Sequence, residues 1–462
     1  MERTCHPLAA LTGLLYLVCL LHGDHAAAAV TTTGTADGSE LWGYVQVRPK
    51  AHLFWWYYKS PQRASSPAKP WPTILWLHGG PGGSGAGRGN FLEVGPLDVN
   101  LKPRNSTWLQ KADLIFVDFP VGVGYSYADD PSALVTTDLQ AAADGTGLLK
   151  ALAKEIPALQ KEGSPLFLVG ESYGGKLAAM IGLSAARAIH AGQLKFTLGG
   201  VVLGDSWISP EDFALTHARL LQDVSRLDDN AVGAANKMAA TVQAQIAAGQ
   251  FGAAEKSWTD LLDLIDSKSG SINIFNFLLD TGVDSMSATS ATGSSSQLMK
   301  YSTYLDGQPS GSESNTIGGI MNGVIKQKLK IIPNNVVWQA ASTQVFDALV
   351  NNFMKPSVNE VDQLLSCGVN VTVYNGQLDV ICPTIGVEAW VQKLTWVGLK
   401  NFLSLPRHPL HYCDSSKLIK AFVRSYENLH FYWILEAGHS VPVDQPCVAL
   451  NMIGSIIQSP AS

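Results

Sequence analysis

Apolar runs recur along the chain and predict a sheet with helices between its strands. The runs Leu41–Arg48 and Leu53–Lys59 lie close together and predict an antiparallel pair. Four later runs predict buried parallel strands, at 73–77, 114–118, 165–169 and 198–204. The stretches between them are long enough for helices, as from Thr137 to Leu159. This alternation predicts an α/β fold with a mostly parallel central sheet flanked by helices.

Residues 209–331 differ from the rest of the chain. They contain amphipathic segments such as Trp258–Ile265, followed by a serine-rich stretch at 285–314 without apolar periodicity. We expect this stretch to be an exposed loop that proteases cut first.

Strand-like runs resume in the last hundred residues, at 369–374 and 429–435. The sheet therefore needs residues from both sides of the 209–331 region. We predict one core formed by 29–208 and 332–462, with 209–331 inserted into it as a helical cap.

The most informative motif is Gly170-Glu171-Ser172-Tyr173-Gly174, directly after the strand predicted at 165–169. Glycines on both sides of a serine allow the sharp strand-to-helix turn that exposes the hydroxyl. A five-residue match alone is a weak signal in a chain with 43 glycines. Its position at a strand end makes Ser172 a candidate nucleophile, with a turn serine of no chemical role as the alternative.

A nucleophilic serine needs a base and an orienting acid, and candidates for both follow it. Asp379 lies just past the strand predicted at 369–374, and His439 follows the last predicted strand through Gly438. Because open α/β sheets gather their chemistry at strand carboxyl ends, we expect Ser172, Asp379 and His439 to meet. The competing acids and bases are Asp362, Asp414, Asp444, His408, His411 and His430.

A second glycine-rich turn offers backbone amides for an oxyanion. His78-Gly79-Gly80-Pro81-Gly82-Gly83 follows the strand predicted at 73–77. Such a turn lets amide hydrogens approach the oxygen of a tetrahedral intermediate, and the amides of Gly80 and Tyr173 are the candidates. A phosphate-binding loop is the alternative, but the lysine and the G-x-G-x-x-G context that it needs are missing.

These motifs together resemble the serine carboxypeptidase family of the carboxypeptidase Y and cathepsin A type, and within it the retinoid-inducible branch. The matching stretches are Trp76–Gly82, Val117–Tyr127, Gly170–Gly175, Asn375–Asp379 and Gly438–Pro442. The resemblance implies an α/β-hydrolase fold. It also implies a peptidase that removes residues from peptide C-termini, with Ser172, Asp379 and His439 as its catalytic triad.

The resemblance further implies how the terminal carboxylate of the substrate is bound. By motif, this carboxylate is bound by a hydrogen-bonded pair of Glu171 and Glu93, together with residue 78 and the turn at Gly79. Trp76 matches the same binding network, but a role in the hydrophobic core is the alternative for it. The family usually has asparagine or glutamine where this chain has His78, which can donate a hydrogen bond but titrates near neutral pH. Two glutamates would repel an anionic chain end unless the pair holds a proton, so we expect activity to be favoured at acidic pH.

Composition and charge agree with a large globular enzyme. The chain has 462 residues, of which 46% are hydrophobic and 15% charged, enough for a substantial core. A formal net charge of -6 gives no basic stripe for a nucleic acid or an anionic membrane, so we expect neither as a partner. The expected partners are peptide or protein C-termini, and a homodimer is left open.

The N-terminus has the features of a secretory signal. Arg3 precedes an apolar segment from Leu8 to Leu21 and a run of alanines, so we expect a signal peptide at 1–28. This segment is short for a membrane span, and no later segment reaches the necessary length. The expected location is the secretory pathway, with the mature protein secreted or lysosomal or vacuolar. Acceptor motifs at Asn105 and Asn370 fit this route, although Asn370 lies at the head of a predicted strand that limits access.

Four cysteines remain after the signal, Cys367, Cys382, Cys413 and Cys447, and they allow three pairings. A bond between Cys367 and Cys382 is disfavoured, because an extended strand between them would hold their ends roughly 20 Å apart. Cys382 lies close to Asp379, where the resemblance allows a free thiol, so the connectivity is left open. No C-x-x-C pair or histidine cluster indicates a metal, and no cofactor is expected.

Two alternative functions remain from different classes. The same fold and triad can pass an acyl group to an alcohol, which would make the protein an acyltransferase. A non-catalytic scaffold of the same fold is the alternative outside enzymes.

Overall fold

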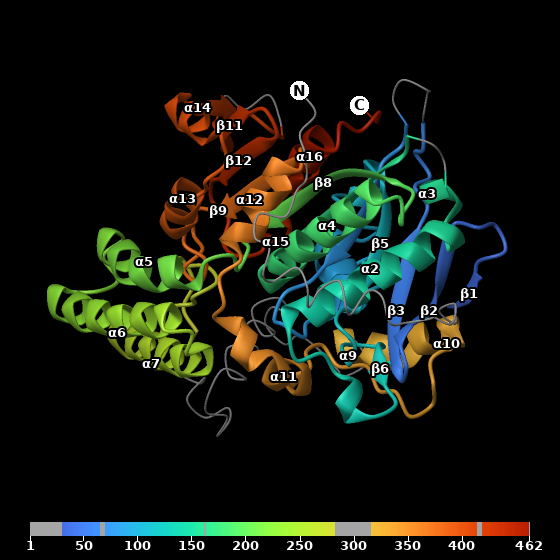
Figure 1. The fold of residues 1–462 in the computed structure, drawn as a ribbon, viewed down its shortest axis with the longest axis horizontal. Coiled ribbons are helices and arrows are strands. Elements are labelled where there is room, and N and C mark those ends of the chain that lie inside the picture. Colours follow the sequence, from blue (N-terminus) through green and yellow to red (C-terminus); the bar gives the residue numbers. More distant parts are fainter. Residues whose placement is uncertain (1–29, 65–69, 161–162, 282–315, 414–417, 462) are drawn as a thin grey trace.

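The computed structural model describes residues 30–64, 70–160, 163–281, 316–413 and 418–461 (Figure 1). The predicted signal peptide, the serine-rich stretch 285–314 and Asp414 lie outside the described residues.

A twelve-stranded sheet forms the centre of the fold, in the order β1-β2-β3-β5-β4-β7-β8-β9-β12-β11-β10, with β6 paired to β3. The strands from β5 to β12 in this order are parallel, and the outer strands on both sides are antiparallel. Their bounds are β1 Val30–Gly34, β2 Glu40–Arg48, β3 Ala51–Tyr58, β4 Thr73–Leu77, β5 Asp113–Val117, β6 Tyr127–Ala128, β7 Pro165–Glu171, β8 Thr197–Gly204, β9 Val371–Gly376, β10 His408–Leu410, β11 Ala421–Tyr426 and β12 Leu429–Ile434. The predicted opening antiparallel pair is confirmed as β2 and β3, and the predicted parallel strands as β4, β5, β7 and β8.

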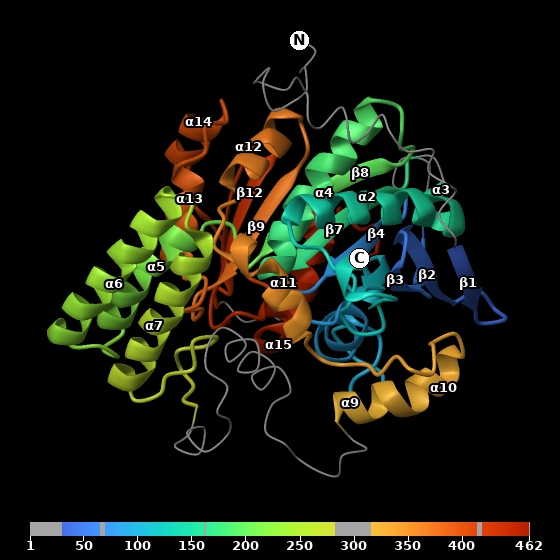
Figure 2. The same cartoon turned by 60° about the horizontal axis from the view of Figure 1, so that its bottom comes forward.

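Helices lie on both faces of this sheet (Figures 1 and 2). The α-helices are α2 Asp138–Glu155, α3 Pro157–Gln160, α4 Tyr173–His190, α5 Pro210–Asp223, α6 Asp229–Ala247, α7 Phe251–Ser269, α9 Ile317–Ile320, α10 Lys326–Leu329, α11 Thr343–Phe353, α12 Val358–Ser366, α13 Thr384–Gln392, α14 Leu399–Ser404, α15 Val441–Asp444 and α16 Pro446–Ile456. Shorter or wider helical turns are η1 Gly85–Val94, η2 Trp108–Gln110, η3 Pro131–Ala133 and η6 Met321–Ile325.

The alternation of side chains along each strand divides the core into two layers. In β4, Leu75 and Leu77 pack into one hydrophobic cluster with α2 and α4, whereas Ile74 and Trp76 pack into a second cluster with α16. Because successive strand residues point to opposite faces, a strand buried on both sides reads as a continuous apolar run. The continuous runs in the sequence therefore predicted the central strands.

The region predicted as a cap contributes to both faces of the sheet. Helices α5, α6 and α7 form a group that projects beyond the sheet (Figure 2), and Trp258 of α7 packs at 5.1 Å between ring centroids on Trp207. Helix α10 lies at the opposite end against β2, where the Trp42 indole donates to the carbonyl of Leu329 at 3.0 Å. The bounds of the predicted cap stay a prediction.

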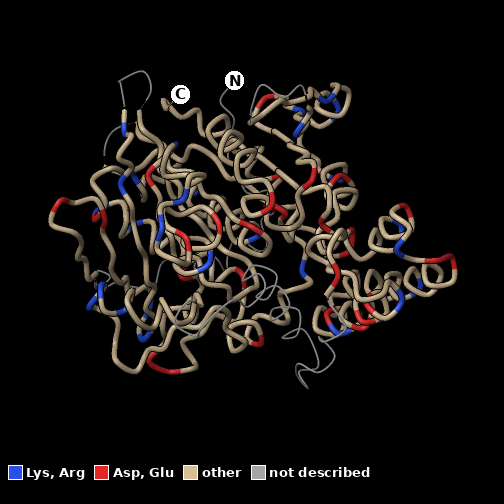
Figure 3. Tube along the Cα trace, turned by 180° about the vertical axis from the view of Figure 1, so that it is seen from behind, with Lys and Arg blue, Asp and Glu red and all other residues tan. Residues whose placement is uncertain are grey.

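Residues of both charge signs are distributed over the fold, with a formal net charge of -6 for the chain. Basic and acidic residues are interspersed along the trace (Figure 3). In the described part of the chain, every helix falls short of the length and apolarity that a membrane crossing needs.

The two predicted glycosylation acceptors, Asn105 and Asn370, are both exposed, so the predicted position of Asn370 at a strand head does not bury it.

The cysteines fall into distinct states. Cys413 and Cys447 form a disulfide across 34 residues, with their Cα atoms 5.8 Å apart. Cys382 is a buried free thiol.

Candidate active site

Ser172 occupies a strained turn between β7 and α4. Its φ of 60° and ψ of -129° place a non-glycine residue at positive φ, which persists only when the surroundings enforce it. Its amide donates to the carbonyl of Gly204 at 2.9 Å, and its own carbonyl accepts from the Trp207 amide at 2.9 Å. A β-carbon at Gly174 would overlap the carbonyl of Leu77, so the turn requires glycine there. Ser172 is the N-cap residue of α4, so its hydroxyl lies at the N-terminus of this helix.

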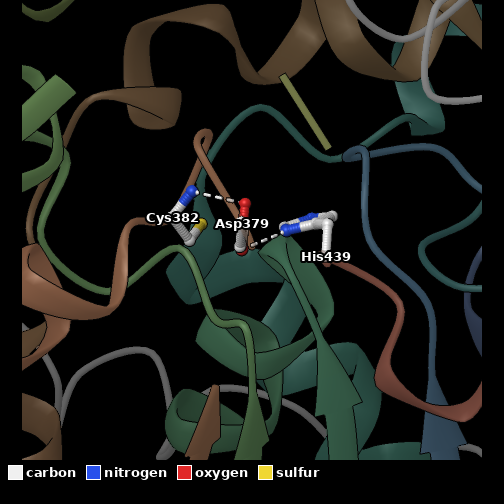
Figure 4. Close-up of side chains that lie close together, drawn as sticks. All are labelled: Asp379, Cys382 and His439. Carbon is white, nitrogen blue, oxygen red and sulfur yellow. Dashed lines mark hydrogen bonds and ion pairs between the residues drawn. The ribbon is translucent and has the colours of Figure 1, made fainter. Parts of the chain in front are cut away.

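Asp379 and His439 form a buried hydrogen-bonded pair (Figure 4). The imidazole Nδ1 lies 2.8 Å from Asp379 Oδ2, and because a carboxylate only accepts, Nδ1 donates. The neutral ring therefore presents Nε2 as its basic atom. Burial lowers the pKa of His439, but the charge and hydrogen bond of Asp379 outweigh it, so that this pKa is raised above its usual value.

The competing acids among the described residues have other partners. Asp362 accepts hydrogen bonds from the main chain of Thr395 and Trp396, and Asp444 accepts from Gly438 and Asn276. His408 and His430 lie within strands β10 and β12.

The three triad candidates follow strands of the same parallel part of the sheet. Ser172 follows β7, Asp379 follows β9 and His439 follows β12, and these parallel strands end at the same edge of the sheet. The hydroxyl of Ser440, next to His439, donates to Glu171 Oε2 at 3.2 Å, and Glu171 precedes Ser172. This contact brings the histidine loop to the serine turn.

The glycine-rich turn after β4 lies directly against the serine. A β-carbon on Gly79 would lie 2.5 Å from the Ser172 Cβ and 3.0 Å from its Oγ. The next residue, Gly80, has a φ of 130° that favours glycine. Tyr173 is the first residue of α4, so its amide belongs to the unpaired donors of a helix N-terminus. Both candidate oxyanion residues therefore flank the serine.

His78, Glu93 and Glu171, the residue before Ser172, form a buried cluster, and one polar atom of each lies within 4.8 Å of the others. His78 Nδ1 is 3.4 Å from Glu93 Oε1. Burial and then the charge of Glu171 hold the pKa of Glu93 well above its usual value, while Arg88 opposes this shift. Burial, with Arg88 and His439, holds the pKa of His78 well below its usual value. The structure therefore favours a neutral imidazole beside a protonated Glu93.

Trp76 is 1% exposed and packs edge-on against Trp108 at 5.4 Å between ring centroids. Its ring also lies against Gly89 of η1, where a β-carbon would collide with the indole nitrogen. A role in carboxylate binding stays a prediction, and the core role is evident from this packing.

Among the residues that the structure describes, two groups have ligand spacing that a metal could use, His78 with both glutamates and Asp379 with Cys382 and His439. In the second group the His439 Nδ1 proton already bonds Asp379, which suits a catalytic pair better than a cation. The expectation of no cofactor stays a prediction.

Several site residues escaped the sequence analysis. Arg88 is fully buried in η1, and Asp205 is fully buried directly after β8. The rule that selected Asp379, a polar residue at a strand carboxyl end, would also have selected Asp205. A charged residue inside a glycine-rich turn was the available signal for Arg88.

A segment after α7 also binds both triad loops. The carbonyl of Ile274 accepts from Val380 and Ile381 at 3.0 and 2.9 Å, and the carbonyl of Phe275 accepts from His439 at 2.7 Å. No sequence pattern marked this segment, because its contribution is made by main-chain carbonyls.

The parallel sheet order and the serine at the turn between β7 and α4 define the protein as an α/β-hydrolase. A sequence model described as serine carboxypeptidase matches residues 31–459, and the chain belongs to this family.

Known proteins agree with this assignment. The chain is 55% identical over 433 residues to serine carboxypeptidase-like 51 of Arabidopsis thaliana, covering 92% of this chain and 93% of that protein. It is 42% identical to the retinoid-inducible serine carboxypeptidase of Rattus norvegicus, covering 96% and 97%. The solved structure of KEX1(delta)p, a prohormone-processing carboxypeptidase from Saccharomyces cerevisiae, matches with a TM-score of 0.70 at 22% identity over 91% of each chain and supports the fold. The predicted family and enzyme class, a serine carboxypeptidase, are thereby confirmed.

Proposed function

We propose that Ser172, His439 and Asp379 are the catalytic triad of this serine carboxypeptidase, which releases C-terminal residues from peptides through an acyl-enzyme. The observation that carries this proposal is the buried His439–Asp379 pair at 2.8 Å beside the strained serine turn. This pair gives the imidazole the tautomer and the basicity that a general base requires.

The reaction follows from these positions. Ser172 Oγ attacks the carbonyl carbon of the last peptide bond while His439 Nε2 takes the hydroxyl proton. The amides of Gly80 and Tyr173 donate to the oxyanion of the tetrahedral intermediate. The intermediate collapses, His439 returns the proton to the leaving amine, and the C-terminal amino acid departs. Water then attacks the acyl-enzyme by the same proton transfers, which breaks the ester bond, releases the shortened peptide and regenerates the serine.

The cluster of His78, Glu93 and Glu171 is the proposed site for the substrate's terminal carboxylate. A protonated Glu93 supplies a donor and removes one negative charge, which an anionic ligand needs. This form is lost as pH rises through the raised pKa of Glu93, whereas His439 must be neutral and gains activity as pH rises. The two opposed titrations predict a bell-shaped profile. The raised pKa of His439 moves its acid limb to higher pH and so works against the acid preference expected from the sequence, which stays a prediction.

The test compares a blocked dipeptide with a free C-terminus and its C-terminal amide. In the wild type, kcat/KM for the free acid should fall at high pH more steeply than for the amide. Glu93→Gln, which keeps a donor but has no proton to lose, should flatten the fall for the free acid and change the amide little. Identical falls for both substrates in both proteins would contradict the carboxylate site.

Product analysis completes the test. Ser172→Ala should abolish turnover and labelling by an organophosphate while the protein stays folded. Adding an alcohol acceptor to the wild type distinguishes hydrolysis from acyl transfer by the product that forms. Labelling of Ser172→Ala at another residue would contradict the assignment of the nucleophile.

We also propose that the protein enters the secretory pathway and is secreted or lysosomal. The Cys413–Cys447 disulfide supports this proposal, because such bonds persist in oxidising compartments. Cell fractionation of the tagged full chain tests it, and retention in the cytosol would contradict it.

A further inference from the structure

Asp205 lies beside the proposed catalytic acid. It directly follows β8, which lies between β7 and β9 in the sheet. Its side chain is fully buried and forms a hydrogen bond with Asp379. Asp205 Oδ1 also accepts from the Gly376 amide at 2.7 Å, and the Asp205 amide donates to the carbonyl of Tyr374 at 2.9 Å. These bonds hold Asp205 at a φ of 42°, which a non-glycine residue rarely adopts.

A hydrogen bond between two carboxyl groups requires a proton, since ionised carboxylates only accept. Asp379 already accepts from His439 Nδ1 through Oδ2 and from the Cys382 amide through Oδ1 at 3.1 Å. Asp379 is therefore the ionised partner, and the proton belongs on Asp205. Asp205 Oδ1 accepts from Gly376, which leaves the buried Oδ2, to which no other donor is assigned, as the oxygen that can carry this proton.

The charges around Asp205 favour the same assignment. Burial holds the pKa of Asp205 well above its usual value, and Asp379 and Glu171 add to this shift. The Gly376 hydrogen bond opposes it. The other titratable groups nearby are the Tyr374 phenol and the Cys382 thiol, whose own pKa values are raised so that both are neutral.

We propose that Asp205 is a positioning residue of the triad that fixes the Asp379 carboxylate through a shared proton and thereby orients His439. The inference rests on the proposed function. Asp205 bonds both Asp379 and Gly376, which begins the turn that carries Asp379, so it anchors this turn at two points. When Asp205 loses its proton, a second negative charge lies against Asp379 and the anchor becomes repulsive.

The decisive variant is Asp205→Asn. Asparagine has the same shape, its oxygen can accept from Gly376 and its NH₂ can donate to Asp379, but it has no proton to lose. The substrate is a blocked amino-acid ester whose leaving group carries no carboxylate, so that the Glu171–Glu93 site does not enter. We expect Asp205→Asn to keep most of the wild-type kcat/KM at acidic pH and to retain it at alkaline pH where the wild type declines. Asp205→Ala should lose on the order of 10²-fold at all pH values, as expected for a misplaced catalytic group.

Asp362→Asn is the matched control. Asp362 is also buried, but it binds the main chain of Thr395 and Trp396. In this variant the alkaline limb of the kcat/KM profile should stay at its wild-type pH. An infrared difference spectrum between the wild type and Asp205→Asn should also show the band of a protonated buried carboxyl. The spectrum of Asp362→Asn should still contain this band.

Three outcomes separate the inference from the proposed function. If Asp205→Asn declines with pH as the wild type does, or if the carboxyl band is unchanged in this variant, the shared proton is refuted. If Asp205→Ala folds and keeps wild-type kcat, the positioning role is refuted. If Asp205→Ala does not fold, the pH profile of Asp205→Asn is the test of the inference. Failure of the proposed function has a different signature, because turnover would then survive in Ser172→Ala, whereas the infrared band is measured without turnover.

Discussion

Gly79→Ala should inactivate the enzyme without unfolding it, because the added methyl group collides with the nucleophile. The new Cβ would lie 2.5 Å from the Ser172 Cβ and 2.9 Å from the carbonyl oxygen of Glu171. Non-bonded carbon atoms pack at about 3.5 to 4.0 Å, so the two turns would have to separate by about 1 Å. The turns cannot separate freely, since β4 and β7 are paired up to Leu77 and Gly170.

Two magnitudes follow from this displacement. Overpacking of a buried site costs about 1 to 3 kcal/mol of stability. A misplacement of about 1 Å at a catalytic group costs about 10²-fold in rate. We therefore expect a modest decrease in Tm together with a decrease of about two orders of magnitude in kcat/KM.

The assay combines thermal unfolding, kcat/KM for the blocked dipeptide and the rate of organophosphate labelling. Gly233→Ala is the matched control, because Gly233 is exposed in α6 and an added β-carbon meets nothing within 4 Å. That variant should gain up to about 1 kcal/mol from helix propensity and keep full activity. Wild-type labelling of Gly79→Ala would refute the close approach of the two turns.

Three further predictions concern charge. Asp379→Asn should lower kcat by about 10⁴-fold, and it should move the acid limb of the profile to lower pH, because Asp379 raises the pKa of His439. An unshifted limb in steady-state profiles would contradict this. Arg88→Met should move the alkaline fall for free-acid substrates to higher pH, because Arg88 lowers the pKa of Glu93; a shift to lower pH would count against the site. Glu93 keeps its proton in the folded state, so the wild-type free energy of unfolding should decrease as pH rises above 4.5, the usual glutamate pKa. The slope should be smaller in Glu93→Gln, and thermal unfolding at several pH values measures both slopes.

The central strands, the serine turn and the order of the triad candidates could all be predicted from the residue types. These features are local. A buried strand is a continuous apolar run, and a sharp turn needs glycine at fixed positions, so both are visible within a few residues. The placement of Asp379 and His439 after the last strands followed from the rule that parallel strands end at one edge. The edge strands β10 and β11 are short or partly exposed and gave no such pattern.

The buried groups around these candidates became known only from the three-dimensional fold. Asp205 reaches the Gly376 amide across 171 residues of sequence, and only the pairing of β8 with β9 brings the two together. The carbonyl of Phe275 reaches His439 from the region inserted between those strands. The sequence does not indicate which main-chain carbonyls will accept hydrogen bonds, because every residue has one. An aspartate that becomes buried cannot be distinguished from an exposed loop aspartate until its neighbours are known. Charges interact through space and not along the chain. Strand pairing therefore determines which charged groups lie close enough to shift the pKa values of the site residues.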